Sequence, residues 1–90
     1  LEWKDSENNF VGKPDQLQTG FEASPEGQAK YLRALHQTVK GAPGGLGRGV
    51  IYWAPEYVAH PGIKTPYENL CLFDFKNEAI LDSWKALAGR

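Results

Sequence analysis

The sequence is poor in the residues that build disulfides and metal centres. Its single cysteine, Cys71, allows no disulfide within the chain, so cysteine usage does not reveal the redox compartment. Cys71 lies in the apolar run Leu70 to Phe73, which favours a buried, unreactive thiol. The 2 histidines have no further histidine or cysteine at ligand spacing, so a zinc site is not expected.

Long apolar runs and charge clusters are also missing. No stretch has the length of a membrane helix or the hydrophobic core of a signal peptide. The formal net charge is -1 and the basic residues are scattered, so neither nucleic acid nor an anionic membrane is an expected partner. The glycine-rich turn at 44–47 precedes a strand, whereas phosphate-binding loops follow one, which excludes a nucleotide-binding loop.

The chain begins with a loop and a well-defined helix. Residues 1–23 contain several turn residues and read as a long loop, which in a compact domain is usually functional or disordered. A helix is predicted over residues 24–41, with Ser24 as N-cap, Pro25 at the first position and Gly41 at the end. One of its faces carries an apolar stripe, formed by Tyr31, Leu32, Leu35 and Val39.

The second half predicts a strand, another loop and another helix. Residues 49–53 include four consecutive apolar side chains, Val50 to Trp53, which suit a strand buried on both faces of a parallel sheet. Residues 54–69 form a loop rich in proline, and residues 77–89 place apolar side chains on one helical face. The predicted fold class is therefore α/β, with long loops before the first helix and after the strand.

Four motifs, in this order, resemble the C-terminal end of family 53 glycoside hydrolases, the arabinogalactan endo-β-1,4-galactanases. They are the helix start Ser24-Pro25-Glu26-Gly27-Gln28, the turn Pro43-Gly44-Gly45, the strand Gly49-Val50-Ile51-Tyr52-Trp53, and the late run from Tyr67-Glu68-Asn69 to Leu72-Phe73-Asp74-Phe75. Together they span most of residues 24 to 75, and the set is far more specific than any one motif.

The resemblance implies part of a larger fold. Family members are (β/α)₈ TIM barrels, which typically take about 250 residues, so the 90 residues correspond to roughly the last quarter of one such catalytic domain. In these barrels the loops that follow the strands build the active site on the C-terminal face. The long loops at 1–23 and 54–69 are therefore expected at that face, and the parent enzyme is expected to be secreted or periplasmic.

The resemblance also assigns roles to residues. Retaining cleavage of β-1,4-galactan needs two catalytic glutamates, and in the family both precede the segment that matches residue 1, so we expect no catalytic residue here and no activity from the isolated chain. Trp53, Glu56 and Tyr67 are the expected substrate-binding residues, with the Trp53 indole stacking on a sugar. The family usually has glutamate directly after this tryptophan, whereas Ala54 follows Trp53 here, so the hydrogen bonds of that glutamate are in doubt.

A calcium site is a further possibility, and no other cofactor is required. Asp5, Glu7 and Asn9 bring oxygen ligands close together, and Ca²⁺ prefers carboxylate and amide oxygens. Bacterial family members bind calcium in this region through an alternating motif, which this sequence follows only in part. A solvated polar loop is the alternative, because a full coordination shell of about 6 to 8 ligands would need residues from elsewhere.

Two other functions remain open at this point. The chain could be a carbohydrate-binding module that stacks sugars on Trp3, Trp53, Tyr57 and Tyr67, or a structural domain that dimerises through an unpaired strand. The expected partners are galactan or arabinogalactan, together with the remainder of the barrel or a second copy. Self-association is predicted for the isolated chain, because exposed strand edges and apolar patches promote pairing between chains.

Overall fold

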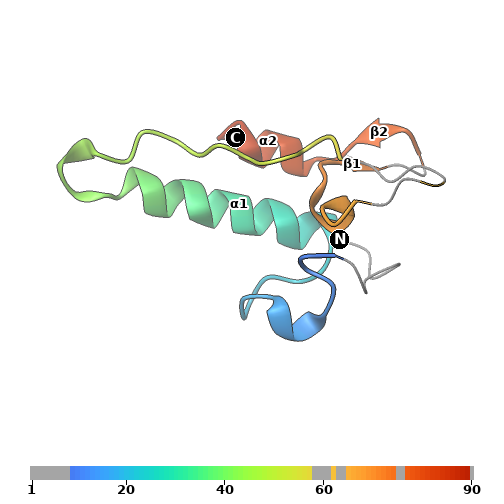
Figure 1. Cartoon of the computed structure of the whole chain (residues 1–90). Coiled ribbons are helices and arrows are strands. Elements are labelled where there is room, and N and C mark those ends of the chain that lie inside the picture. The colour runs from blue at the N-terminus through green and yellow to red at the C-terminus, as the bar shows by residue number, and fades with distance from the viewer. Residues whose placement is uncertain (1–8, 58–61, 63–64, 75–76, 90) are drawn as a thin grey trace.

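The computed structural model describes residues 9–57, 62, 65–74 and 77–89. Their regular elements are the helices α1 (Pro25–Lys40) and α2 (Ser83–Leu87), the strands β1 (Phe73–Asp74) and β2 (Ala79–Ile80), and three 3₁₀ turns at Pro14–Gln16, Pro43–Gly45 and Glu68–Leu70. Figure 1 shows α1 as the longest element, with the following chain turning back along it. None of the helices in this part of the chain has the length and apolarity that a membrane crossing requires.

Helix α1 begins and ends as the sequence indicates. The Ser24 hydroxyl accepts a hydrogen bond from the Gly27 amide at 2.9 Å, which satisfies one of the free N–H groups of the first turn. Pro25 occupies the first position and Gly41 is the C-cap. Gly27 is required by packing, because a Cβ there would overlap the Glu22 carbonyl oxygen. The start of α1 is thereby fitted against the loop that precedes it.

After α1 the chain reverses and returns as a stretch without helix or strand, residues 46–53, which we call the return segment (Figure 1). Gly44 and Gly45 adopt positive φ angles of 69° and 67°, the left-handed region that favours glycine. At Gly47 the return segment passes so close to α1 that a Cβ would overlap the Val39 carbonyl oxygen. The glycine-rich turn therefore holds the return segment against the helix.

The strand predicted over residues 49–53 is not formed. Residues 47–53 make no backbone hydrogen bond to another backbone group in the described part of the chain. A strand needs a neighbour to complete its ladder, and the described residues contain only the antiparallel pair β1 and β2, with Phe73 opposite Ile80. The structure thus contains helices and a small antiparallel sheet, whereas the parallel sheet of a barrel is not present among these residues.

The helix predicted over residues 77–89 is shorter than expected. Asp74 accepts hydrogen bonds from the Asn77 backbone amide at 3.1 Å and from the Asn77 side chain at 2.7 Å, which turn the chain between the two strands. Glu78 has a φ of 51°, which a right-handed helix does not allow. Ala79 and Ile80 then pair as β2, so α2 starts only at Ser83.

The core lies where α1 and α2 meet the chain around Leu72. Its buried members are Ala29, Leu32, Leu72 and Ala86, with Tyr52 and Leu87 packed against them. Cys71 is also buried, as predicted, and its thiol lies 3.2 Å from the Phe73 carbonyl oxygen. The core fixes α1, α2 and the return segment relative to one another.

Candidate functional site

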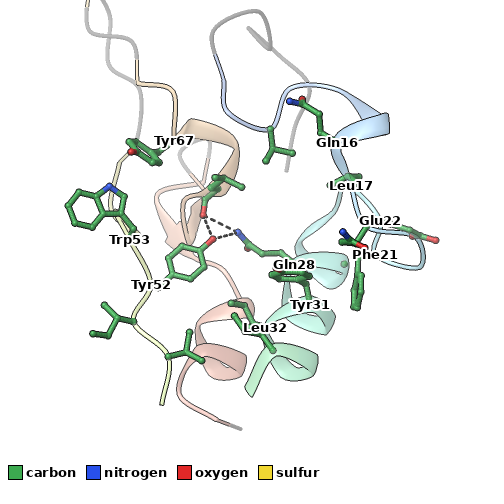
Figure 2. Close-up of a pocket in the computed structure, with 17 residues that line it drawn as sticks. Gln16, Leu17, Phe21, Glu22, Gln28, Tyr31, Leu32, Tyr52, Trp53 and Tyr67 are labelled. Carbon is green, nitrogen blue, oxygen red and sulfur yellow. Dashed lines mark hydrogen bonds between the residues drawn. The ribbon is translucent and has the colours of Figure 1, made fainter. Parts of the chain in front are cut away.

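An open cleft of about 400 Å³ lies between the loop before α1, the first half of α1 and the return segment. Figure 2 shows Tyr31 and Leu32 of α1 facing the strip of chain that carries Tyr52 and Trp53. Tyr67 and Leu70 line the cleft at one end. The lining residues therefore come from three stretches of the chain that are separate in sequence, within residues 11–35, 50–53 and 67–70.

Trp53 and Tyr52 point in opposite directions from the return segment. In Figure 2 the Tyr52 ring is directed toward Gln28, whereas the Trp53 indole is directed away from it. Trp53 is 72% exposed and Ile51 is 97% exposed, while Val50 and Tyr52 are partly buried. This alternation is typical of a strand, although no ladder is formed. The Trp53 indole is thus an exposed flat surface rather than a core side chain in this structure.

Tyr67 belongs to a small group of aromatic rings that also contains Phe10 and Tyr57. Its ring centroid lies 5.0 Å from that of Phe10 and 5.7 Å from that of Tyr57, both in edge-to-face geometry. Phe10 is 59% exposed and Tyr57 is 45% exposed. Exposed aromatic faces of this kind can stack on the apolar face of a sugar ring.

Gln28 is the buried polar centre beside the cleft. Its Nε2 donates to the carbonyl oxygens of Leu70 at 3.1 Å and Cys71 at 3.3 Å, and lies 3.4 Å from the Tyr52 hydroxyl. Its Oε1 accepts a hydrogen bond of 2.7 Å from the Ser83 hydroxyl. Both ends of the amide are satisfied, as a buried polar group requires. One side chain therefore connects α1, α2, the return segment and the 68–70 turn.

The network fixes the orientation of its members. The Gln28 Nε2 must face the two carbonyl oxygens, because the reversed amide would place an oxygen against them. Tyr52 donates its hydroxyl proton to the Leu70 carbonyl oxygen at 2.7 Å. Burial raises the pKa of the Tyr52 phenol above its ordinary value, an effect that the hydrogen bond from Gln28 partly opposes. The phenol therefore stays protonated and remains a donor at neutral pH.

The sequence pattern gives Gln28 no role beyond its place in the helix-start motif. It lies four residues before Leu32, at the start of the apolar stripe on α1. A polar amide in line with an apolar stripe is the signal that could have identified it, because a buried amide must find hydrogen-bond partners. Its partners could not have been named, since they lie 24 to 55 residues along the chain.

Glu56 is placed outside the cleft. Ala54 adopts a φ of 55°, and the Tyr57 amide donates to the Ala54 carbonyl oxygen at 3.3 Å, so residues 54–57 form a turn. Glu56 lies exposed in this turn and does not line the cleft. The structure therefore brings Trp53 and Tyr67 to one cleft and leaves Glu56 beside it.

The predicted calcium ligands are only partly covered by the structure. Asp5 and Glu7 lie outside the described residues, and Asn9 is partly buried. Within the described ranges, no group of three or more histidine, cysteine, aspartate or glutamate side chains could hold a metal ion. The calcium site stays a prediction.

The cleft has the chemistry of a binding surface. Among the described residues that line it, Glu22 is the only carboxylate, whereas glycoside hydrolysis takes a pair on opposite sides of the scissile bond. The lining is otherwise aromatic, aliphatic and amide side chains. These groups can bind and orient a sugar.

Comparisons with known proteins agree with one another. An arabinogalactan endo-beta-1,4-galactanase from Cellvibrio japonicus is 41% identical over 83 residues, which cover 84% of this chain and 21% of that protein. A probable arabinogalactan endo-beta-1,4-galactanase A from Aspergillus terreus is 33% identical over 66 residues, covering 73% of this chain and 18% of that protein.

The similarity extends further in a bacterial relative. An uncharacterized protein in the bgaB 5'region of Niallia circulans is 39% identical over 95 aligned positions, covering 97% of this chain and 25% of that protein. The chain thus spans at most about a quarter of the length of these curated relatives. No solved structure matches the chain. The model of Glycosyl hydrolase family 53 matches residues 1–87, and the chain belongs to this family.

Proposed function

We propose that this chain supplies the C-terminal sugar-binding and structural portion of a secreted, retaining endo-β-1,4-galactanase, without the two catalytic glutamates. The observation that carries the proposal is the family match over residues 1–87, together with the exposed Trp53 and the partly buried Tyr67 at one cleft. Galactan and arabinogalactan are the proposed substrates because two relatives are named for them.

The geometry supports a role in binding. Trp53 offers an exposed indole face, and Tyr67 is fixed between two other rings about 5 to 6 Å away. A sugar chain that crosses this end of the molecule would meet flat aromatic surfaces from two distant parts of the sequence. Glu56 is retained as a candidate hydrogen-bonding residue at the edge of this surface.

The proposal is tested with a hybrid enzyme in which residues 1–87 replace the matching segment of the Cellvibrio galactanase. The hybrid should hydrolyse β-1,4-galactan. The isolated 90-residue chain should release no reducing sugar, because the catalytic pair lies elsewhere. A folded hybrid without activity would contradict the proposal, and so would hydrolysis by the pure chain that Glu56→Gln or Glu68→Gln abolishes.

Trp53→Ala then separates binding from folding in the hybrid. Because the indole is 72% exposed here, its removal should lower activity on galactan far more than it lowers the melting temperature. Trp84→Ala is the matched control, since this tryptophan is 45% exposed on α2 and does not line the cleft. Equal losses of activity and stability from Trp53→Ala would favour a core role for this residue.

A carbohydrate-binding module without catalysis is the second candidate, favoured by the exposed rings of Phe10, Trp53 and Tyr57. It predicts that the isolated chain binds galactan in affinity electrophoresis, while the hybrid has no activity. The galactanase proposal predicts instead that the hybrid is active on galactan.

A further inference from the structure

We propose that Gln28 is a positioning residue for substrate, which sets the distance between Trp53 and Tyr67. The inference rests on the proposed galactan-binding function. Gln28 lines the cleft but is only 7% exposed, so it offers little surface of its own to a ligand. Its effect is exerted through the two chain segments that carry the aromatic residues.

The first segment is the return segment, which packs against the core but has few polar contacts to hold it. Residues 47–53 make no hydrogen bond to another backbone group in the described part of the chain. Tyr52 is therefore its main polar anchor, through the hydroxyl that donates to the Leu70 carbonyl oxygen and lies near the Gln28 Nε2. Trp53 is the next residue, so the position of its indole depends on this anchor.

The second segment is the turn that carries Tyr67. The Leu70 amide donates to the Tyr67 carbonyl oxygen at 2.8 Å, which closes the 3₁₀ turn at Glu68–Leu70. Gln28 holds the far end of this turn through the carbonyl oxygens of Leu70 and Cys71. The Gln28 Nε2 thus contacts both the 68–70 turn, which follows Tyr67, and Tyr52 of the return segment, which precedes Trp53.

The two ends of the Gln28 amide contact different parts of the molecule, and Figure 2 shows the Nε2 end directed toward Tyr52. The Nε2 end of Gln28 faces the two aromatic-bearing segments, while the Oε1 end accepts from Ser83 on α2. Ser83 is fully buried and does not line the cleft. Ser83→Ala therefore removes one hydrogen bond from the same amide without releasing either aromatic residue.

The first experiment follows the Trp53 indole in the full chain, with Trp3→Phe and Trp84→Phe so that Trp53 is the only indole. Time-resolved fluorescence anisotropy reports its local motion. Gln28→Met should increase the amplitude of fast depolarisation, and Ser83→Ala should leave it unchanged. Equal anisotropy decays in the two variants would overturn the inference. Tyr52→Phe, which removes only a hydroxyl, is the milder variant that should show the same increase if Gln28→Met does not fold.

The second experiment measures galactan hydrolysis by the hybrid enzyme. Gln28→Met and Tyr52→Phe should each raise KM for galactan about fivefold with little change in kcat, the pattern of lost binding that is uniform in ground and transition states. Their double variant should lose less than the product of the two effects, because both act through the Leu70 carbonyl oxygen. Ser83→Ala should lower the melting temperature at unchanged KM.

The two experiments separate failure of the inference from failure of the proposed function. An active hybrid in which Gln28→Met and Ser83→Ala have the same KM would overturn the positioning role alone. A folded but inactive hybrid would overturn the galactanase function, and with it the role of Gln28 toward substrate.

Discussion

The α1–α2 core and the return segment contain comparable apolar side chains in opposite environments. In the core, Leu32 and Leu72 are 1% and 0% exposed. In the return segment, Leu46 and Ile51 are 80% and 97% exposed. The core side chains are covered by this chain itself. The return segment has one covered face, which carries Tyr52, and one apolar face that the described residues leave open.

This difference shows that an apolar run predicts burial. It does not predict whether the same chain or another chain buries it. The return segment alternates like a strand, yet its backbone has no ladder partner in the described part of the molecule. A long exposed apolar edge promotes pairing with another strand. This supports the proposal that the return segment is completed by other parts of a barrel or by a second copy.

The largest expected effect is the loss of folding stability when a core leucine is truncated. The comparison is the same truncation of an isoleucine in the return segment. Leu72→Ala should destabilise the chain by about 2 to 5 kcal/mol, because it leaves a cavity at a fully buried site. Ile51→Ala should change stability by about 0.5 kcal/mol or less, because the side chain is almost fully exposed. Urea unfolding at low protein concentration measures both. Similar costs would show that Ile51 is buried in solution.

The second prediction concerns self-association of the isolated chain. The chain should form oligomers at micromolar concentration, and Ile51→Lys should weaken association by about tenfold or more, since an apolar contact is replaced by a charge. Ile80→Lys is the control, because Ile80 is 51% exposed on β2 and does not belong to the return segment. Sedimentation equilibrium measures the association constants. A chain that folds cooperatively and stays monomeric throughout the micromolar range would contradict the proposal that the return segment pairs with another chain.

The smallest effect is a loss of stability at high pH. Burial raises the pKa of Tyr52 in the folded chain, so the unfolded chain loses this proton first as the pH rises. The stability that the neutral phenol contributes is complete below the ordinary tyrosine pKa of about 10 and is lost as the pH rises through the folded value. Tyr52→Phe should make the melting temperature less dependent on pH above about 10. An unchanged pH dependence would mean that Tyr52 is solvated.

Helix α1 was predictable because its signals are local. Ser24 provides the cap and Pro25 tolerates the first position, and both act on the adjacent turn of the backbone. The capping hydrogen bond from Gly27 to Ser24 follows directly from that spacing. No distant residue is needed to decide where this helix begins.

The predicted strand and second helix depended on information that the local pattern does not hold. Val50 to Trp53 have strand-like composition, but a strand exists only with a neighbour. The apolar spacing around Ile80 also fits a helix, yet the positive φ of Glu78 and the pairing of Ile80 with Phe73 exclude one there. Periodicity alone could not reveal either competing interaction.

The candidate site was predictable in its residue types and not in its connections. Trp53 and Tyr67 line one cleft. Glu56 was expected beside them, and the positive φ of Ala54 turns the chain so that Glu56 lies outside the cleft. The Gln28 network was missed because it depends on the packing of four distant segments.

The contact between Gly27 and the Glu22 carbonyl oxygen sets a boundary for recombination between relatives. Since a Cβ at Gly27 would overlap that oxygen, the helix start and the loop before it fit only as a pair. A crossover placed between residues 22 and 27 would join α1 to a loop from another protein, and the close packing of Gly27 on the Glu22 carbonyl oxygen would no longer be matched. The exchangeable unit therefore begins upstream of Glu22, and hybrid galactanases should be joined there.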